Sequence, residues 1–393
     1  MNDFRPIALT SVPMKCFEKI IKFHLLAECA EQLDPLQFAY KPRRGVDDAI
    51  LLFSNNLYKH LDVPKGYVRT LFVDFSSAFN TIQPHILVNK LLEMNVSPNI
   101  ALWIMRFLTH RPQYVSIKDK NVTYQSTQIV TNTGAPQGTV LAPVLFSIYT
   151  NDCQSNITNV PIIKYADDTA IQALIKNEKD LHVFNQVISN FVVWCEDNYL
   201  QLNVKKTKEM IFDFRKKGDV HKSLDIKTER VERVNEYKYL GVVFDENLDW
   251  SCHSKKVVGG LKVKVHLMRK LFCLKVDNRL LSMFFKSCMV SVLCFCLAGW
   301  GGNTRKYWED KINRLLKHAN KMMNNTVFSN FQDYFVSCCN DKINKILRDE
   351  SHPLHSEIQI SKRSGRLIHC KTKTERHRRS FIPFAIQNYK FKL

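Results

Sequence analysis

The sequence contains no Cys-x-x-Cys pair, although twelve cysteines are spread over its 393 residues. Structural zinc sites need closely spaced cysteine and histidine ligands, so this scatter excludes a zinc finger or a zinc ribbon. A signal peptide, an internal repeat and a long low-complexity segment are also absent. Together these absences predict reduced thiols in an intracellular protein.

A clear membrane-spanning run is missing as well. The most apolar stretch, residues 283–300, is interrupted by Lys286. It also falls short of the roughly 20 residues that a transmembrane helix needs. We therefore predict a buried helix of a C-terminal domain and no membrane partner, with a true span as the less favoured alternative.

Acidic residues are scarce relative to basic ones. The chain has 37 Asp and Glu against 57 Lys and Arg, which gives a formal net charge of +20. This balance favours a polyanionic partner, nucleic acid before a membrane. The 45% apolar content is that of an ordinary globular protein, and the length suffices for two or three hydrophobic cores.

The most informative stretch covers residues 161–171, where two short apolar runs are joined through Asp167 and Asp168. The run that ends at Tyr165 is typical of one strand, and the run that begins at Ala170 of the next. The acidic pair is therefore predicted at a tight hairpin turn. Because adjacent carboxylates repel and hard divalent cations prefer carboxylate oxygen, we interpret the pair as half of a metal site.

A third carboxylate, Asp74, follows an uncharged and mostly apolar run that is typical of a buried strand. On its own it could simply cap the following helix. Beside Asp167 and Asp168 another role is favoured, because three carboxylates on neighbouring strand ends can hold two magnesium ions about 3.5 to 4 Å apart.

Two loops carry residue types suited to binding. Residues 37–45 place two aromatic residues beside Lys41, Arg43 and Arg44, which predicts either a solvated loop or a nucleic-acid contact. Residues 132–143 hold two glycines and two prolines. Small residues let a backbone approach a flat ligand, and the alternative is a plain connection to a helix entered through Pro143.

The remaining elements follow from spacing. A strand-like run covers residues 4–9, and helices are predicted at residues 15–26, 47–61, 144–149 and 178–200. The apolar face of the first helix contains Cys16, Phe17, Ile20, Ile21, Leu25 and Leu26. Gly241 is predicted inside a strand, at a bulge or a close approach of another backbone. Long helices with basic faces begin at Trp250, and residues 362–379 are typical of a flexible basic tail.

Five motifs occur in the order of the palm motifs of reverse transcriptases, and their residues resemble those of the non-LTR retrotransposon (LINE) branch. They are Phe72-Val73-Asp74-Phe75-Ser76-Ser77-Ala78-Phe79, Gly134-Ala135-Pro136-Gln137-Gly138, Tyr165-Ala166-Asp167-Asp168, Leu202-Asn203 with Lys206-Thr207-Lys208, and Tyr239-Leu240-Gly241. With Phe4-Arg5-Pro6-Ile7, the similarity takes in most of residues 2–245.

The resemblance implies an α+β fold of the right-hand polymerase type, with fingers, an antiparallel-sheet palm and a helical thumb. Residues 1–60 would be partial fingers, and residues 61–248 a palm with an inserted finger segment. Residues 249–330 would form the thumb-like domain, and residues 331–393 a basic C-terminal region.

The resemblance also implies roles for single residues. Asp74, Asp167 and Asp168 would be the catalytic, metal-binding triad, with the Phe75 carbonyl as a further ligand. Phe79 would exclude a ribose 2′-hydroxyl. The remaining nucleotide, template and primer contacts would come from Arg5, Gln137, Gly138, Lys206, Lys208, Leu240 and Gly241.

The implied reaction is RNA-directed DNA synthesis with two Mg²⁺ ions, for which Mn²⁺ is a substitute. The partners would be an RNA template, a DNA primer and deoxynucleoside triphosphates, and nuclear action is implied. Asn80 departs from the aspartate that is frequent in this branch, with little expected loss. LINE proteins also carry an endonuclease and finger residues ahead of the Arg5 motif. We therefore expect a fragment of a longer reading frame or a decayed copy, and the alternative function is a catalytically dead, basic nucleic-acid-binding remnant.

Overall fold

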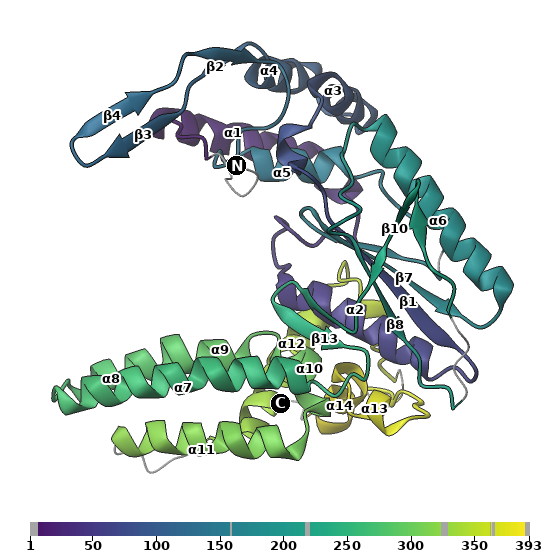
Figure 1. The fold of residues 1–393 in the computed structure, drawn as a ribbon, viewed down its shortest axis with the longest axis vertical. Coiled ribbons are helices and arrows are strands. Elements are labelled where there is room, and N and C mark those ends of the chain that lie inside the picture. The colour runs from purple at the N-terminus through teal and green to yellow at the C-terminus, as the bar shows by residue number, and fades with distance from the viewer. Residues whose placement is uncertain are drawn as a thin grey trace.

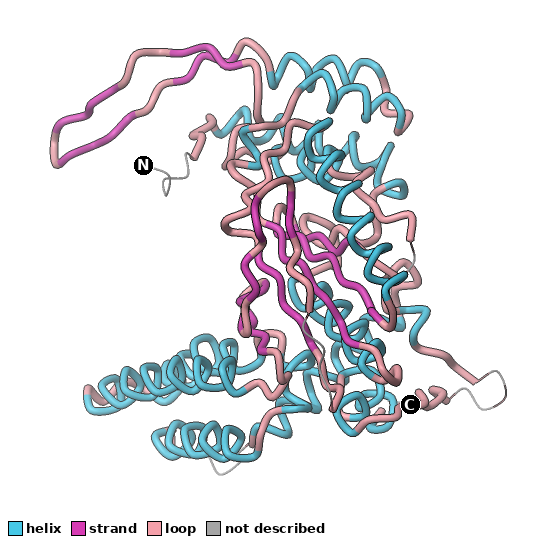
Figure 2. The backbone as a smooth tube through the Cα atoms, turned by 45° about the vertical axis from the view of Figure 1, so that its right-hand side comes forward, coloured by secondary structure: helices cyan, strands magenta, loops and turns pink. Residues whose placement is uncertain are grey.

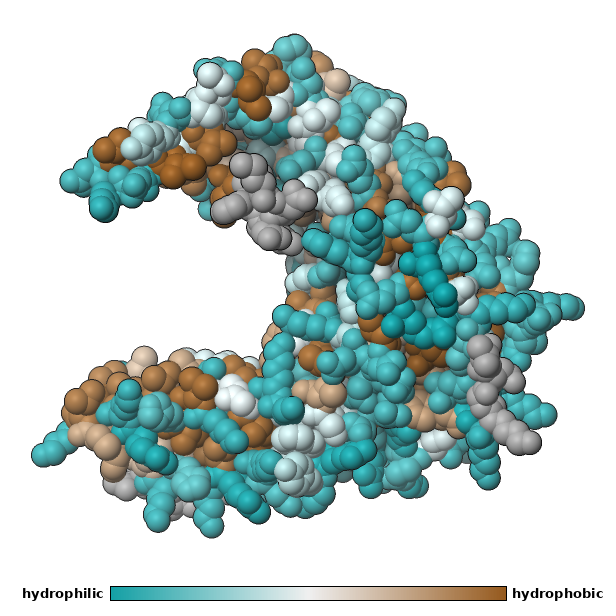
Figure 3. Space-filling model, in the orientation of Figure 1, coloured by the Kyte–Doolittle hydropathy of each residue, from teal (hydrophilic) through white to brown (hydrophobic). Residues whose placement is uncertain are grey.

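A twisted sheet forms the middle of the molecule, between an upper arm and a lower helical arm (Figure 1). The computed structural model describes residues 7–157, 159–216, 221–323, 329–361, 363 and 366–389. The two arms project to the same side of the sheet and leave an open space between them (Figure 3). The molecule therefore has the shape of a C with the sheet at its back.

The central sheet has five strands in the order β11-β8-β1-β7-β6. They are β1 (Tyr67–Val73), β6 (Ile162–Tyr165), β7 (Asp168–Ile175), β8 (Lys208–Phe212) and β11 (Glu232–Arg233). All neighbours are antiparallel except the short edge strand β11, which is parallel to β8. The predicted α+β fold class with an antiparallel sheet is confirmed.

The upper arm and one face of the sheet are built from helices and a β-ribbon that reaches away from the body (Figure 2). The helices are α1 (Val12–Cys29), η1 (Ala30–Gln32), η2 (Ala78–Asn80), α3 (Pro84–Glu93), α4 (Pro98–Leu108), α5 (Ala142–Tyr149) and α6 (Glu178–Asp197). The ribbon contains β2 (Arg111–Gln113), β3 (Ser116–Asp119), β4 (Val122–Gln125) and β5 (Ile129–Thr131).

The opposite face carries α2 (Val46–Leu61), the hairpin of β12 (Glu236–Tyr239) with β13 (Val242–Asp245), and the helical arm. A second hairpin, β9 (Asp225–Ile226) with β10 (Glu229–Arg230), packs on the α6 side, where Ile226 and Val231 enter the core. The helices are α7 (Ser251–Cys273), α8 (Asn278–Phe284), η3 (Phe285–Val290), α9 (Ser291–Cys294), α10 (Leu297–Trp300), η4 (Gly301–Asn303), α11 (Lys306–Met322), α12 (Phe331–Leu347), η5 (His355–Glu357), α13 (Glu375–Arg378) and α14 (Phe381–Asn388).

The side chains of β1 divide between two cores, because successive residues of a strand point to opposite faces. Leu71 and Val73 enter the core shared with α3, α5 and α6. Val68 and Phe72 enter the other core, shared with α2 and the helical arm. One strand therefore ties both halves of the molecule together.

The predicted apolar face of α1 is wrong in part. Phe17 is 44% exposed and Ile20 is 54% exposed, whereas Glu18 and Leu25 are fully buried. The Glu18 carboxylate accepts hydrogen bonds from the two backbone N–H groups just before α5, at Val140 (2.6 Å) and Leu141. This polar contact turns the helix so that part of its apolar stripe faces outward. Residues 7–11 form no strand, and residues 4–6 lie outside the described residues.

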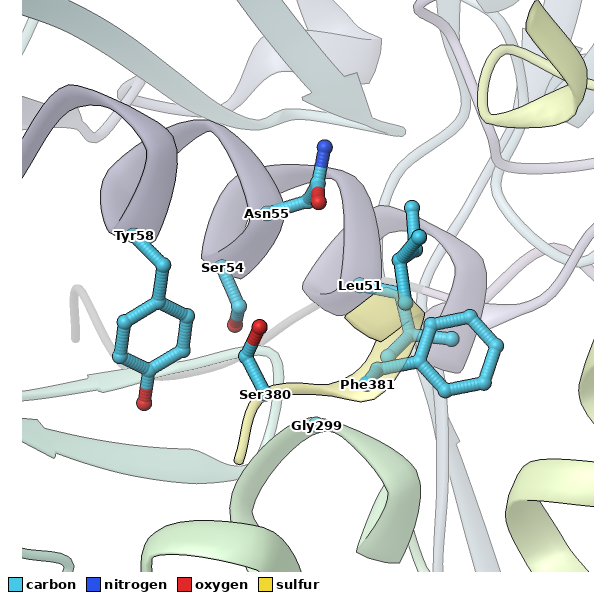
Figure 4. A pocket seen from close by; sticks show the side chains of 8 residues that line it. Leu51, Ser54, Asn55, Tyr58, Gly299, Ser380 and Phe381 are labelled. Atoms are coloured by element: carbon cyan, nitrogen blue, oxygen red, sulfur yellow. The ribbon is translucent and has the colours of Figure 1, made fainter. Parts of the chain in front are cut away.

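The prediction of a flexible basic tail at residues 362–379 is also wrong for the described part. Phe381 and Ile382 are buried against α2, and just before them the His377 ring contacts the Asp62 carboxylate at 2.6 Å. A cavity of about 10 Å³ lies between these elements (Figure 4). Its lining residues are Leu51, Ser54, Asn55, Tyr58, Gly299, Ser380, Phe381 and Ile382. The apolar residues that follow the basic ones anchor this region to the sheet's α2 layer.

The apolar run of the lower arm, Asn278–Asn303, is long and apolar enough to cross a membrane by length and composition. Its backbone is not one continuous helix, because Phe295 is extended and Cys296 is left-handed with φ of +50°. Leu281, Met289 and Leu293 are fully buried in the arm. The predicted buried helix is therefore found as a series of shorter, partly buried turns.

His253 of α7 makes the stability of the fold depend on pH. The ring is 3% exposed, and its Nδ1 accepts a hydrogen bond from the Val243 N–H. Burial lowers the pKa of His253 to about 4. Because the unfolded chain binds this proton near pH 6.5, the contribution of the neutral ring is complete above that pH. It is lost as the pH falls toward 4.

We expect the free energy of unfolding to drop by about 1.5 kcal/mol between pH 6.5 and pH 5 through this one residue. Chemical unfolding at both pH values measures it. His253→Asn keeps an acceptor for Val243 and should remove that part of the pH dependence, whereas His318→Gln on exposed α11 should not. An unchanged pH dependence in His253→Asn would contradict the assignment.

Candidate active site

Two of the three predicted carboxylates are brought together by strand register. Strands β1 and β7 are antiparallel, with Phe72 opposite Ala170 and Val73 opposite Thr169. The next positions in this register are Asp74 and Asp168. Residues directly opposite in antiparallel strands have Cβ atoms about 5 Å apart, so these two carboxylates leave neighbouring strands at the same edge of the sheet.

The same register assigns a face to this pair. Phe72 and Ala170 lie two residues before Asp74 and two after Asp168, and both enter the core beneath the β12–β13 hairpin. Because a strand alternates with a period of two, Asp74 and Asp168 point to that same face. The pair thus lies on the side of the sheet from which the lower arm extends.

Tyr237 of β12 adjoins this carboxylate pair. Its ring stacks on Phe72 with a centroid distance of 4.2 Å. Burial raises the pKa of Tyr237 to about 12, helped by the negative charges of Asp168 and Asp74. Sequence reasoning missed this residue, although an aromatic two positions before Tyr239 shares its face of the strand and could have indicated it.

Asp167 occupies the predicted hairpin turn between β6 and β7, where Tyr165 pairs with Asp168. Ala166 adopts the left-handed conformation with φ of +55°. Burial raises the pKa of Tyr40, and the charge of Asp167 adds to that shift. The charge of Asp167 therefore acts on Tyr40, whereas the charges of Asp74 and Asp168 act on Tyr237.

The residues at this edge suit a hard divalent cation. Within the described ranges, no three His, Cys, Asp or Glu side chains already stand as a ready metal cage. The donors are nevertheless carboxylate oxygens, which Mg²⁺ prefers. Asp74 and Asp168 are register neighbours, and Asp167 is joined to Asp168 by one peptide bond. A divalent cation bound here would neutralise the mutual repulsion of these carboxylates.

The Leu202-to-Lys208 motif holds the backbone of Asp74. The Asp74 N–H donates to the Thr207 hydroxyl at 3.3 Å, and that hydroxyl donates to the Asn203 carbonyl at 2.8 Å. The Asn203 N–H in turn donates to the Asp74 carbonyl at 2.9 Å. Phe75 forms an isolated bridge with Leu202. Asp74 is therefore fixed by backbone pairing and does not cap a helix, since Ser77 precedes η2.

The two candidate lysines of this motif differ in surroundings. Lys208 pairs with the Glu232 carboxylate at 2.6 Å. Lys206 is exposed in the turn before β8. The ion pair at Lys208 makes Lys206 the better candidate for an approaching phosphate.

The glycine-rich loop packs on the chain that follows Asp74. The Gly134 N–H donates to the Ile82 carbonyl at 2.7 Å, and the Ala135 N–H donates to the Phe79 carbonyl at 2.8 Å. A Cβ on Gly134 would lie 2.8 Å from the Asn80 carbonyl oxygen. The Phe79 ring stacks on Phe146 of α5 at 4.7 Å. This glycine therefore permits a close approach of two backbones and fixes the position of Phe79.

Gln137 and Gly138 lie against the N-terminal segment. The Ala8 N–H donates to the Gln137 carbonyl at 2.6 Å, and a Cβ on Gly138 would lie 2.9 Å from the Ala8 carbonyl oxygen. The segment that begins with the Arg5 motif thus continues beside this loop. Arg5 itself lies outside the described residues.

Gly241 does not lie inside a strand as predicted. Leu240 and Gly241 are the two turn residues between β12 and β13, with φ of +46° and +89°. Two consecutive positive φ angles are typical of the hairpin turns that match strand twist. A Cβ on Gly241 would also lie 3.0 Å from the Phe295 ring. The predicted close approach is therefore real, but its partner is a side chain.

The basic segment at residues 37–45 is largely committed to internal contacts. The Lys41 ammonium donates to the Asp34 carbonyl at 2.6 Å. Arg44 pairs with Asp349, and its side chain is 7% exposed. A solvated loop is therefore the wrong interpretation for these two residues, and Arg43 and Tyr40 are the members still open to a ligand.

Comparison with known proteins points to one family. Residues 1–244 match the family described as reverse transcriptase (RNA-dependent DNA polymerase). The RNA-directed DNA polymerase from mobile element jockey of Drosophila melanogaster is 26% identical over 280 residues, which are 68% of this chain and 30% of that protein. The probable RNA-directed DNA polymerase from transposon BS of the same fly is 22% identical over 313 residues, which are 76% of this chain and 34% of that protein. The chain thus spans about a third of these relatives.

Solved structures give a more distant similarity. Apo telomerase from Candida tropicalis is 12% identical, with a TM-score of 0.40, and covers 85% of this chain and 59% of its own. Telomerase from Candida albicans, solved with a fragment of telomeric RNA, is 13% identical with a TM-score of 0.37, covering 88% of this chain and 58% of its own.

Proposed function

The chain belongs to the reverse transcriptase (RNA-dependent DNA polymerase) family, and from this premise we propose that it extends a DNA primer on an RNA template as the polymerase of a non-LTR retrotransposon. The observation that carries the proposal is the register of β1 and β7, whose continuation by one residue beyond Val73 and Thr169 brings Asp74 beside Asp168. Asp167 follows in the adjoining turn. Two-metal nucleotidyl transfer is the reaction that such a carboxylate set serves.

The proposed mechanism asks the protein mainly for positioning. Bound Mg²⁺ would lower the pKa of the primer 3′-hydroxyl and stabilise charge on the triphosphate. Asp74 and Asp168 would hold the ions from neighbouring strands, with Asp167 and the Phe75 carbonyl completing the ligands. Lys206 would meet the leaving pyrophosphate. Fixed orientation and charge stabilisation would then supply the rate.

Primer extension by the full chain tests the function. A DNA primer annealed to an RNA template, with deoxynucleoside triphosphates and Mg²⁺ or Mn²⁺, should be extended, and Asp167→Ala should abolish extension. The competing function is a catalytically dead nucleic-acid-binding remnant. Salt-dependent binding of primer and template without any extension would favour that remnant and refute the enzyme.

Replacing Phe79 should relax the choice of sugar. Its ring is held against Phe146 at 4.7 Å by the turn that follows Asp74, and in the proposed site it collides with a 2′-hydroxyl. We expect Phe79→Val to raise the relative incorporation of ribonucleotides by about tenfold or more, since a steric clash of about 1.4 kcal/mol equals one factor of ten.

Competition between a ribonucleotide and its deoxy analogue on one template measures this ratio. Phe107→Val on α4 removes a ring from another part of the upper arm and serves as the matched control. Unchanged sugar selectivity in an active Phe79→Val enzyme would argue against the gate.

A further inference from the structure

Helix α7 carries basic residues without any acidic counterpart. Ser251–Cys273 contains Lys255, Lys256, Lys262, Lys264, Arg269 and Lys270, and no Asp or Glu. Lys255, Gly259, Lys262, His266, Arg269 and Cys273 recur every three or four residues, and all six are exposed. This spacing places them on one side of the helix, so α7 presents to solvent a stripe whose cationic members are Lys255, Lys262 and Arg269.

Helix α11 presents a second stripe beside the first. Tyr307, Lys311, Arg314, His318 and Lys321 recur at the same helical spacing. The two helices pack against each other along the lower arm (Figure 1). The Lys311 ammonium holds the pKa of Tyr307 below its usual range, and the charge of Lys262 on α7 adds to that effect. The stripes therefore form one surface, called here the outer basic surface.

This surface includes an aromatic side chain that is open to a ligand. Tyr307 is 59% exposed. The Lys311 ammonium lies over the Tyr307 ring at 4.1 Å and over the Trp308 ring at 5.0 Å. A flat ring beside a cation is the combination that binds unpaired bases and their phosphates.

The nearby acids of α11 do not cancel the charge. Glu309 and Asp310 both pair with the Lys306 ammonium, at 3.3 Å and 3.6 Å. Arg314 and Lys321 lie further along the helix and are exposed. The positive charge of the outer basic surface therefore remains available over most of its length.

The outer basic surface lies away from the open space between the arms. The opposite flank of α7 packs on α9, where a Cβ on Gly260 would lie 3.9 Å from Val292. Figure 3 shows hydrophobic side chains on the edge of the lower arm that faces the open space, and hydrophilic ones along the edge below. Helix α11 runs along that lower edge (Figure 1).

We propose that the outer basic surface of α7 and α11 binds a single-stranded stretch of nucleic acid, namely template RNA outside the polymerase site. The identity of the strand as template rests on the proposed function. Lys262, Arg269 and Arg314 contact phosphates, and Tyr307 stacks on a base. Phosphate contacts carry no sequence information, so binding is sequence-tolerant and steeply salt-dependent.

Fluorescence anisotropy of the full chain with a labelled single-stranded oligouridylate tests the proposal. An excess of a short, unlabelled RNA–DNA hybrid is present to occupy the space between the arms. We expect Lys262→Ala/Arg314→Ala to weaken binding about tenfold at 50 mM salt. It should also reduce the slope of log K against log salt by about 1.4, because each lost phosphate contact removes about 0.7 for a single strand.

Tyr307→Leu should weaken binding at least about fivefold and leave the salt slope unchanged, since stacking is not ionic. The matched control, Lys176→Ala/Lys179→Ala, makes the same change in charge at exposed positions before and within α6. Equal weakening by the control variant overturns the proposal. The proposal is also overturned if Lys262→Ala/Arg314→Ala weakens the binding of the duplex alone.

Two further arms identify the ligand. A single-stranded DNA of equal length that binds as RNA does, with the same variant effects, supports the shared phosphate and base chemistry. If Lys262→Ala/Arg314→Ala loses binding to phosphatidylserine vesicles while its RNA binding is unchanged, the surface binds a membrane and the proposal is overturned. No arm requires nucleotide addition, so a chain that binds as expected but extends no primer refutes only the proposed function.

Discussion

Asp74→Asn is expected to lower the rate of primer extension by about 10³-fold or more. The amide keeps the size of the carboxylate and the backbone contacts to Thr207 and Asn203, so only the charge is lost. Metal ions contribute several kcal/mol of charge stabilisation in the transition state, and about 4 kcal/mol corresponds to three powers of ten. The change should act on the rate and on the Mg²⁺ concentration needed for half-maximal activity.

The measurement is single-nucleotide extension at several Mg²⁺ concentrations. Asp225→Asn removes an exposed carboxylate on β9 and is the matched control. Primer and template binding should persist in Asp74→Asn, because the basic surfaces are intact. Extension within tenfold of the unaltered chain would remove Asp74 from the metal site.

Strand-level features of this site could be predicted from sequence because their signals are local. The hairpin at Asp167 and the strand that ends at Asp74 follow from short apolar runs broken by charge, and both were correct. The order of the motifs predicted the family. Register could not be predicted, because the pairing of β1 with β7 depends on the contacts of both faces of the sheet.

The errors have a common physical origin in long-range polar contacts. Glu18 turns α1 toward α5 through two hydrogen bonds, each between residues more than a hundred positions apart in sequence. Arg44 is bound by Asp349, and His377 by Asp62, across 305 and 315 residues. Local spacing carries no signal for such internal pairs, since a basic run is usually a solvated one.

Within the β6–β7 hairpin lies a buried cation whose removal should be costly. Lys164 of β6 is 1% exposed. Its ammonium donates to the Thr150 and Cys153 carbonyls at 2.7 and 2.6 Å, and pairs with the Asp34 carboxylate at 2.7 Å. The ammonium therefore has two hydrogen-bond acceptors and one ionic partner, and pairing of this kind is the condition under which a buried charge is tolerated.

Lys164→Met is expected to reduce the free energy of unfolding by about 3 to 5 kcal/mol. The thioether fills most of the space, but it leaves the Asp34 carboxylate buried without its cation. Urea unfolding measures the loss. Lys179→Met, which changes an exposed lysine of α6 in the same way, should alter stability by less than about 0.5 kcal/mol.

Removing both charges separates the cost of a buried, unpaired Asp34 carboxylate from the cost of lost packing. In Lys164→Met/Asp34→Asn the amide is neutral, so we expect the double variant to recover at least about 1 kcal/mol relative to Lys164→Met alone. Failure to recover would mean that the two carbonyl contacts, and not the ion pair, hold Lys164. In both cases the turn at Asp167 begins two residues beyond Lys164, so the stability of the hairpin and the placement of its carboxylates depend on this buried lysine.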